Sequence, residues 1–560
     1  MRSLYLRLVI FPLFGMISPN EISRSYDNDG QHKRPAPTRP PEARQLPLGY
    51  EPIETTSAFW QQKAQNILAS KLAETPVRAK AKNVIFFIGD GMSPQTIAAT
   101  RMYLGNENKM LAFDEFPYLG TARTYCVDRQ VPDSACTASA YLSGVKVNYG
   151  TINVGASVPR YSCAYNRTEA EFLGLLKWAQ DNDMATGVVT TTRITHATPA
   201  GTYASTADRD WEDDSYVRKA GCDPSQYPDI ADQLVNGEVG KRIKVILGGG
   251  RRHFYSSTQR DEENSPGSRA DGRNLVNEWL SQHSDWAEYV WNQTSLQAVN
   301  VDNTSHLLGL FESSHCLYNL EIDEGNLQAS EPKLSEMVVV AVKMLRKSES
   351  GFFLFVEGGR IDTAHHETRP RLALEETAEY SKAIGLARQM TSVEDTLIVV
   401  SSDHSHTMTY NGYQTRGNDI LGIADISDID ELPYTTLSYA NGEGYFVAYT
   451  PDNLAERADI SGLDFSDFHS QYPATVPRDS ETHGGEDVAV YASGPMAHIF
   501  RGNFEQNVIP SLIAYAAEIG PFAGTEQDSD GSGSAVFICF RLAVICGVIG
   551  LLVQLRWYRL

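Results

Sequence analysis

Residues 351–366, GFFLFVEGGRIDTAHH, decide the fold class of this chain. The unbroken apolar run 352–356 is typical of a short strand that is buried on both faces of a parallel sheet. The pair Gly358-Gly359 indicates a sharp turn at its end. Carboxylate and imidazole side chains, which suit zinc or magnesium, gather here: Glu357, Asp362, His365 and His366. Taken alone, a polar loop after a core strand explains this motif more simply, so the rest of the chain has to decide.

Similar apolar runs recur along the chain with helical patterns between them. Strands are predicted at 84–88, 188–192, 244–247, 352–356, 396–401 and 487–491, and helices at 169–180 and 370–390, after an amphipathic helix near 55–72. Strands that alternate with helices predict an α/β fold, in which helices flank a large, mostly parallel sheet.

Polar residues follow four of these strands. Sites in such sheets form beyond the carboxyl ends of the strands, where neighbouring strands converge. The residues concerned are Asp90, His196, Thr198, Glu357, Asp403, His404 and His406. Because an ordinary polar loop would not produce this convergence, the pattern favours a site that holds several metal ions.

Asp133 and Ser134 precede a small-residue helical segment. They fit a simple N-cap pair, but a Ser at a helix N-terminus also faces free N–H groups that suit an anionic ester on its oxygen. Such a hydroxyl needs a base or a metal for activation, and the chain has no G-x-S-x-G elbow. Arg209 is the candidate partner for a phosphoryl group because its planar fork can hold two oxygens, although a surface ion pair is the alternative.

The charge of the chain excludes one class of function and its ends indicate a compartment. A net charge of −22 argues against nucleic-acid binding. Residues 1–25 resemble a signal peptide and 26–50 form a proline-rich basic arm. The small polar spacer 526–534 contains a candidate ω site, and the hydrophobic tail 535–560 fits either a removed GPI signal or a membrane span. Either way, we expect the globular part to lie outside the cell.

Other features agree with the secretory pathway. Asn166, Asn292 and Asn303 begin glycosylation sequons. Five cysteines precede the tail, and an odd number predicts at least one free thiol or an intermolecular bond.

Long motifs in this chain resemble the animal alkaline phosphatases, and the insect membrane-bound members most of all. The motifs are FFIGDGMS, VPDSACTASAYLSGVK, THATPAGTYAST, VILGGGRR, FVEGGRIDTAHH, SSDHSH and ETHGGEDVAVYASGP, in family order over about 55–520. The resemblance implies a catalytic domain at 51–525 that hydrolyses phosphate monoesters at alkaline pH. The reaction would pass through a phosphoserine and release alcohol and inorganic phosphate.

The resemblance also implies roles for single residues. Ser134 would be the nucleophile and Arg209 would bind phosphate. One zinc would be held by Asp90, Asp403 and His404 in contact with Ser134; the second zinc by Asp362, His366 and His483; and magnesium by Asp90, Thr198 and Glu357, with His196 close by. His483 precedes its strand instead of following it, so only the resemblance points to it.

Further implications concern assembly. An irregular insertion at about 407–482 would form a crown at the interface of a homodimer, and a GPI anchor would attach the enzyme to the outer face of the membrane. A calcium site would comprise Glu263, Phe311, Glu312 and Glu331, and a disulfide would join Cys163 to Cys222, which leaves Cys126, Cys136 and Cys316 open.

Two other functions remain as alternatives. A phosphodiesterase or sulfatase of the same superfamily is one, although the sulfatase motif C/S-x-P-x-R is absent and related diesterases usually carry Thr as the nucleophile. A catalytically silent surface receptor is the other; degenerate metal ligands would have favoured it, and here every ligand position is filled.

Overall fold

A ten-stranded sheet forms the centre of the molecule. The computed structural model describes residues 51–283, 285–450 and 453–524, so the expected signal peptide, basic arm, spacer and tail lie outside the described residues. The strand order is β19-β2-β18-β8-β1-β7-β3-β4-β6-β5. The strands are β1 (Asn83–Gly89), β2 (Tyr118–Arg123), β3 (Ala185–Arg193), β4 (Val245–Gly249), β5 (Ala287–Val290), β6 (His306–Leu310), β7 (Phe352–Gly358), β8 (Thr396–Ser402), β18 (Val488–Ser493) and β19 (Gly502–Glu505).

The directions of the strands confirm a mostly parallel sheet. β1 pairs in parallel with β7 and β8, and β3, β4, β5 and β6 continue the parallel arrangement. β18 runs antiparallel to both β8 and β2. The amino-terminal end of β18 therefore lies at the same edge of the sheet as the carboxyl ends of its parallel neighbours.

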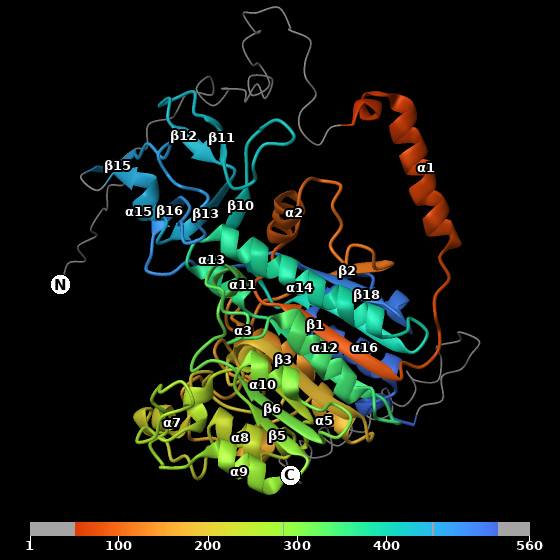
Figure 1. Cartoon of the computed structure of the whole chain (residues 1–560), viewed down its shortest axis with the longest axis vertical. Coiled ribbons are helices and arrows are strands. Elements are labelled where there is room, and N and C mark those ends of the chain that lie inside the picture. Colours follow the sequence, from red (N-terminus) through yellow and green to blue (C-terminus); the bar gives the residue numbers. More distant parts are fainter. Residues whose placement is uncertain (1–50, 284, 451–452, 525–560) are drawn as a thin grey trace, which may run out of the picture.

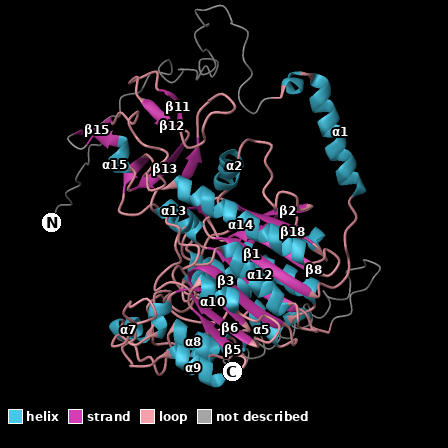
Figure 2. Ribbon diagram, in the orientation of Figure 1, coloured by secondary structure: helices cyan, strands magenta, loops and turns pink. Residues whose placement is uncertain are grey.

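Helices cover both faces of the sheet, as Figures 1 and 2 show. Val84, Phe86 and Ile88 of β1 belong to one buried cluster, and Ile85 and Phe87 belong to another, because successive side chains of a strand point to opposite faces. Each fully buried Phe stabilises the fold by roughly 1.5–3 kcal/mol. The first face is covered by α3 (Ser134–Ser143), α5 (Leu175–Gln180), α8 (Ile230–Asn236) and α16 (Ile509–Ala517), and the second by α12 (Leu334–Leu345) and α14 (Pro370–Met390).

Eight further α-helices lie in the described part of the chain, outside α1 and the segment 407–482. They are α2 (Pro94–Tyr103), α4 (Arg167–Ala170), α6 (Ala197–Ala200), α7 (Asp214–Lys219), α9 (Leu275–Gln282), α10 (Gln293–Ala298), α11 (Asn319–Glu324) and α13 (Arg360–His366).

Two helix predictions need correction. The segment 169–180 is interrupted between α4 and α5, because Glu171 pairs with Val154 in an isolated β-bridge and Gly174 packs tightly on α3. A Cβ on Gly174 would lie 2.0 Å from the carbonyl oxygen of Leu142. The helix near the amino terminus forms as α1 (Ser57–Ala73), but none of its residues is buried within the described part of the chain, so it has no core-facing side. Figure 1 shows α1 standing apart from the sheet.

The segment 407–482 contains more regular structure than its composition predicts. Its elements are β10 (Met408–Tyr410), β11 (Ile423–Ile426), β12 (Pro433–Thr435), β13 (Leu437–Gly442), α15 (Tyr445–Ala448), β14 (Tyr449–Thr450), β15 (Asn453–Arg457) and β16 (Ala474–Pro477). They form small two- and three-stranded sheets that gather beside α2 and α13 in Figure 1.

Candidate active site

The candidate site lies at the carboxyl edge of four neighbouring strands, β8, β1, β7 and β3. Asp90 follows β1, Glu357 lies near the end of β7, and Asp403 with His404 follows β8. His196 and Thr198 follow β3, at the start of α6. The sheet thus brings together the polar residues that the sequence placed after separate strands.

The glycine pair after β7 provides space rather than unusual backbone angles. Gly359 has φ −83° and ψ −17°, which any residue can adopt. A Cβ on Gly359 would lie 2.2 Å from Cγ2 of Thr192, and a Cβ on Gly358 would lie 2.8 Å from the ring of Tyr380. The expected sharp glycine turn is therefore wrong in its cause, because close packing excludes side chains at these two positions.

The first group of side chains surrounds Ser134, the first residue of α3. Nε2 of His404 lies 3.3 Å from Oγ of Ser134, 3.2 Å from Oδ2 of Asp403 and 3.5 Å from Oδ1 of Asp90. Burial and the nearby Asp403 carboxylate raise the pKa of Asp90 well above its usual value. Burial raises the pKa of Asp403 to about 6. Two carboxylates so close together in a buried site call for a cation.

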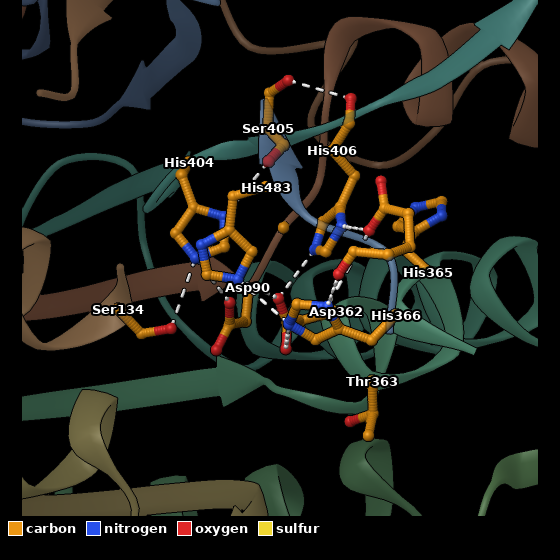
Figure 3. A network of polar contacts seen from close by, with 12 residues as sticks. Asp90, Ser134, Asp362, Thr363, His365, His366, His404, Ser405, His406 and His483 are labelled. Atoms are coloured by element: carbon orange, nitrogen blue, oxygen red, sulfur yellow. Dashed lines mark hydrogen bonds and ion pairs between the residues drawn. The ribbon is translucent and has the colours of Figure 1, made fainter. Parts of the chain in front are cut away.

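The second group contains Asp362 and His366 on α13 with His483 of β17 (His483–Gly484), as Figure 3 shows. Nδ1 of His366 lies 2.5 Å from the carbonyl oxygen of Glu481, and Nδ1 of His483 lies 2.8 Å from that of Pro132. Since a carbonyl only accepts, each Nδ1 carries a hydrogen, and each neutral ring keeps its lone pair on Nε2. These two Nε2 atoms lie 3.0 Å apart, and the Asp362 carboxylate flanks both.

His406, which the sequence placed among the polar residues that follow the strands, lies in the second group and supports Asp362. β17 pairs with β9 (Ser405–His406), so His483 and His406 are register partners. Nε2 of His406 lies 2.7 Å from Oδ1 of Asp362, and its Nδ1 lies 2.5 Å from Oε2 of Glu481. Burial lowers the pKa of His406, but the two carboxylates outweigh burial and raise it to about 10. His406 thus lies between two carboxylates and orients Asp362.

The third group lies on the β3 side of Asp90. Oε2 of Glu357 accepts hydrogen bonds from Thr190 and, at 2.9 Å, from Thr192. Oγ1 of Thr198 lies 3.5 Å from Oδ2 of Asp90. Sequence reasoning missed the roles of Thr190 and Thr192, although three consecutive threonines in a buried strand were a visible signal. Burial raises the pKa of Glu357 to about 7, while the threonine hydroxyls oppose this shift.

Arg209 lies between Asp133 and His196. Its NH1 group donates to Oδ2 of Asp133 at 2.9 Å, and its NH2 group lies 3.1 Å from Nε2 of His196. Oδ1 of Asp133 caps α3 by accepting from the backbone N–H of Cys136 at 3.3 Å. The N-cap interpretation of Asp133 is correct, but the same carboxylate also holds Arg209 beside Ser134.

Several buried atoms in these groups lack a hydrogen-bond partner of suitable geometry among the described residues. They are Oδ1 of Asp90, Nδ1 of His196, Oε1 of Glu357 and Oδ2 of Asp403. Buried polar atoms without partners are costly unless an ion or water satisfies them. Three clusters here bring ligand atoms within 4.8 Å of one another: Asp90-Asp403-His404, Asp362-His366-His406-His483 and Asp90-His196-Glu357. The donor sets fit divalent metal ions.

The expected calcium residues are less tightly assembled. Phe311 and Glu312 follow β6, and burial together with Glu312 raises the pKa of Glu331 to about 8. Oε1 of Glu331 accepts from the backbone N–H of Leu317 at 2.7 Å, while Glu263 forms an ion pair with Arg251. Among the described residues, these carboxylates do not join a three-member ligand cluster.

The described cysteines form two disulfides. Cys163 is joined to Cys222, the pair that the resemblance implied, and Cys126 is joined to Cys136. Cys316 is buried and has no disulfide partner among the described cysteines. Of the sequon residues, Asn166 caps α4, Asn292 caps α10 and Asn303 lies in an exposed turn.

A serine at a helix N-terminus, an arginine beside it and three carboxylate-imidazole groups define a metal-dependent hydrolase that acts on phosphoryl groups. Residues 81–519 match the model of the alkaline phosphatase family. The membrane-bound alkaline phosphatase of Bombyx mori is 44% identical over 482 residues, covering 84% of this chain and 86% of the relative. The tissue-nonspecific isozyme of Gallus gallus is 45% identical over 487 residues, covering 84% and 91%.

The fold agrees with solved structures. Alkaline phosphatase from Thermus thermophilus gives a TM-score of 0.55 at 22% identity, covering 79% of this chain and 92% of that one. The chain belongs to the alkaline phosphatase family, and it is a phosphomonoester hydrolase. Among the described residues, no helix combines the length and apolar character needed to cross a membrane.

Proposed function

We propose that this enzyme hydrolyses phosphate monoesters through a phosphoserine at Ser134. The observation that carries the proposal is the position of Ser134, which starts α3, lies 3.3 Å from Nε2 of His404 and directly follows Asp133, the residue that binds Arg209. The N-terminus of α3 presents backbone N–H groups and a positive dipole end to a phosphoryl group. The planar fork of Arg209, held by Asp133, would bind its non-bridging oxygens.

The residues present fit two zinc ions and one magnesium ion. Zinc would be held by Asp90, Asp403 and His404 beside Ser134 and by Asp362, His366 and His483, and magnesium by Asp90, Thr198 and Glu357, with His196 nearby. When bound, such ions lower the pKa of a coordinated hydroxyl or water and stabilise charge on phosphoryl oxygens. A mutant of the TAB5 alkaline phosphatase was solved with Mg bound in its M3 site, which supports a magnesium position in this fold.

The protein's own residues would then perform two displacements. Oγ of Ser134 attacks the phosphorus while the alcohol leaves in line, and Arg209 holds the equatorial oxygens throughout. A water then attacks the phosphoserine from the side that the alcohol left and releases inorganic phosphate. His406 keeps Asp362 oriented, and Thr190 and Thr192 keep Glu357 oriented, so the ligand carboxylates need little rearrangement.

Replacing Ser134 tests the nucleophile. Ser134→Ala should abolish the burst of alcohol release from an aryl phosphate, whereas Ser143→Ala, at the other end of α3, should retain it. An undiminished burst in Ser134→Ala would exclude the assignment.

Rates on a matched aryl phosphate, phosphodiester and sulfate separate the diesterase and sulfatase alternatives. Chelator-sensitive activity on the monoester excludes a silent receptor.

We also propose that the enzyme is held on the outer face of the membrane by a lipid anchor. The support is the small-residue spacer and hydrophobic tail together with the relative from Bombyx mori, which is described as membrane-bound. A phosphatidylinositol-specific phospholipase should release the activity from intact cells. Retention of the activity after this treatment would favour a membrane span.

A shift in mass after removal of N-linked glycans, mapped to Asn166, Asn292 and Asn303, tests glycosylation.

A homodimer and a calcium ion complete the proposal. Trp60, Ile67 and Leu68 of α1 are exposed, which is unfavourable for an isolated subunit and is relieved if a second copy covers the helix. Sedimentation should therefore give about twice the mass of one chain.

Calcium bound by Glu263, Phe311, Glu312 and Glu331 should raise the melting temperature of the wild type and not that of Glu331→Gln.

A further inference from the structure

A disulfide encloses the segment that carries the candidate nucleophile. Cys126 follows β2, and Cys136 lies in the first turn of α3, two residues after Ser134. Both are almost completely buried, in a small cluster with Val147 and Phe172. We call residues 126–136 the Ser134 loop. Its part 127–131 is exposed and belongs to no helix or strand.

The Ser134 loop contacts three parts of the site at once. Ser134 itself faces His404. Asp133, the preceding residue, accepts from NH1 of Arg209 at 2.9 Å and from the backbone N–H of Gly150 at 3.0 Å. The carbonyl oxygen of Pro132 lies 2.8 Å from Nδ1 of His483. The loop thus positions the attacking oxygen, the phosphate-binding arginine and a candidate zinc ligand through three consecutive residues.

The loop has few other attachments. Within 127–131, Val127 donates its backbone N–H to the carbonyl of Val147 at 3.0 Å, Oδ1 of Asp128 accepts from the backbone N–H of Tyr149 at 2.8 Å, and Val131 lies near Gly485. These contacts attach the segment to residues 147–149 and to Gly485, but none of them holds Pro132 itself, so the position of its carbonyl depends on whether the far end of the loop is fixed. The disulfide supplies that fixed end, because it ties Cys126 to the first turn of the helix that starts at Ser134.

We propose that the Cys126–Cys136 disulfide is a positioning bond for catalysis, which sets the relative placement of Ser134, Arg209 and His483. This inference rests on the proposed function of these three residues. Cys126 and Cys136 touch no reacting atom; they act through Pro132 and Asp133. Because a misplacement of about 1 Å can cost as much as 10²-fold in rate, loss of the bond reduces catalysis even where the fold survives.

The test compares Cys126→Ala/Cys136→Ala with Val235→Ala. Val235 is buried on α8, a helix that carries none of the candidate site residues, so this control reports a loss of stability. The double variant should lose about tenfold or more in kcat/KM for an aryl phosphate at 25 °C. It should also release zinc to a chelator faster, because Pro132 no longer anchors His483.

A merely structural bond would give a different result. If kcat/KM and the rate of zinc loss in the double variant stay within about twofold of the wild type while the melting temperature falls as in Val235→Ala, the proposal is wrong. Rates of zinc loss are read without substrate, so they test the inference even if the wild type has no phosphatase activity, a result that would overturn the proposed function instead.

A reductant provides a second, independent comparison. A water-soluble phosphine should lower the activity of the wild type to that of the double variant and leave the double variant unchanged. The Cys163–Cys222 bond is present in both proteins, so an equal loss in both would assign the effect to that bond and contradict the proposal. Peptide mapping without reduction should recover Cys126 linked to Cys136, and free thiols at both positions would also overturn it.

Discussion

The Nε2 atoms of His366 and His483 lie 3.0 Å apart, although 117 residues separate them in the chain. Each ring has its Nδ1 against a backbone carbonyl, so in the neutral rings two lone pairs face one another beside the Asp362 carboxylate. Such an arrangement is unfavourable unless a cation lies among the three groups.

Removing metal should therefore destabilise the protein as well as inactivate it. A chelator should lower the melting temperature, and added zinc should restore it. At a zinc concentration 100 times the Kd, binding should add about 2.7 kcal/mol to the free energy of unfolding. In His483→Ala, zinc should restore less stability because one ligand is missing. Scanning calorimetry with and without zinc measures both effects, and equal restoration in the two proteins would contradict the ligand assignment.

Replacing Arg209 should reduce the stabilisation of the transition state. Arg209→Ala should lower kcat/KM for phosphate monoesters roughly 10²-fold, as expected when a charged donor is lost from a developing anion. Arg209→Lys should recover part of this loss, since an ammonium lacks the planar fork. Arg218→Ala, which removes an exposed arginine paired with Asp214, is the matched control and should retain normal kinetics.

A methyl group at position 359 should disturb the magnesium side of the site. In Gly359→Ala, the new Cβ would meet Thr192 at 2.2 Å and the Glu357 carboxyl carbon at 3.0 Å. Displacing Thr192 removes a hydrogen bond from Glu357, and overpacking of this kind costs about 1–3 kcal/mol. We expect a lower melting temperature and weaker activation by magnesium. Gly462→Ala, which has open space around it, should change neither; an unchanged magnesium titration in Gly359→Ala would contradict the packing argument.

Glu376 on α14 should make stability fall with rising pH. Burial raises the pKa of its carboxyl from 4.5 to about 8, while the backbone N–H of Asn319, at 2.6 Å, opposes the shift. Between these two values the folded state keeps a proton that the unfolded state has released, so the free energy of unfolding decreases as pH rises, by on the order of a few kcal/mol in total.

Glu376→Gln should remove this dependence, because the amide keeps the hydrogen bond to Asn319 and cannot ionise. Denaturant unfolding of both proteins at pH 5, 7 and 9 checks the prediction. The stability of the variant relative to the wild type should increase from the lowest pH to the highest. A constant difference across the series would show that Glu376 is already ionised in the folded state.

The sheet and half of the site were predictable because they depend on local pattern. The strand 352–356 and the helix Pro370–Met390 follow from apolar runs and a proline in the first turn, and both form at those positions. The parallel strands then place Asp90, Glu357 and Asp403 at one edge as a consequence of topology. The broken helix at 169–180 could not be predicted, because its interruption arises from a bridge between Glu171 and Val154.

His483 shows most clearly why local pattern is insufficient. It precedes β18, and β18 runs antiparallel to its neighbours, so the residues before this strand reach the same edge as the residues after the others. Strand direction is decided by pairing across the sheet, which no run of residues encodes by itself.

The sequence by itself determined the α/β class, the strand ends that carry ligand-type side chains and the family motifs, because these depend on residue type, spacing and order along the chain. The tertiary structure alone decided which nitrogen of His366 and His483 faces the site, that His406 lies between the carboxylates of Asp362 and Glu481, and that Cys126 pairs with Cys136. These properties depend on carbonyls, carboxylates and a thiol that folding brings together from distant segments.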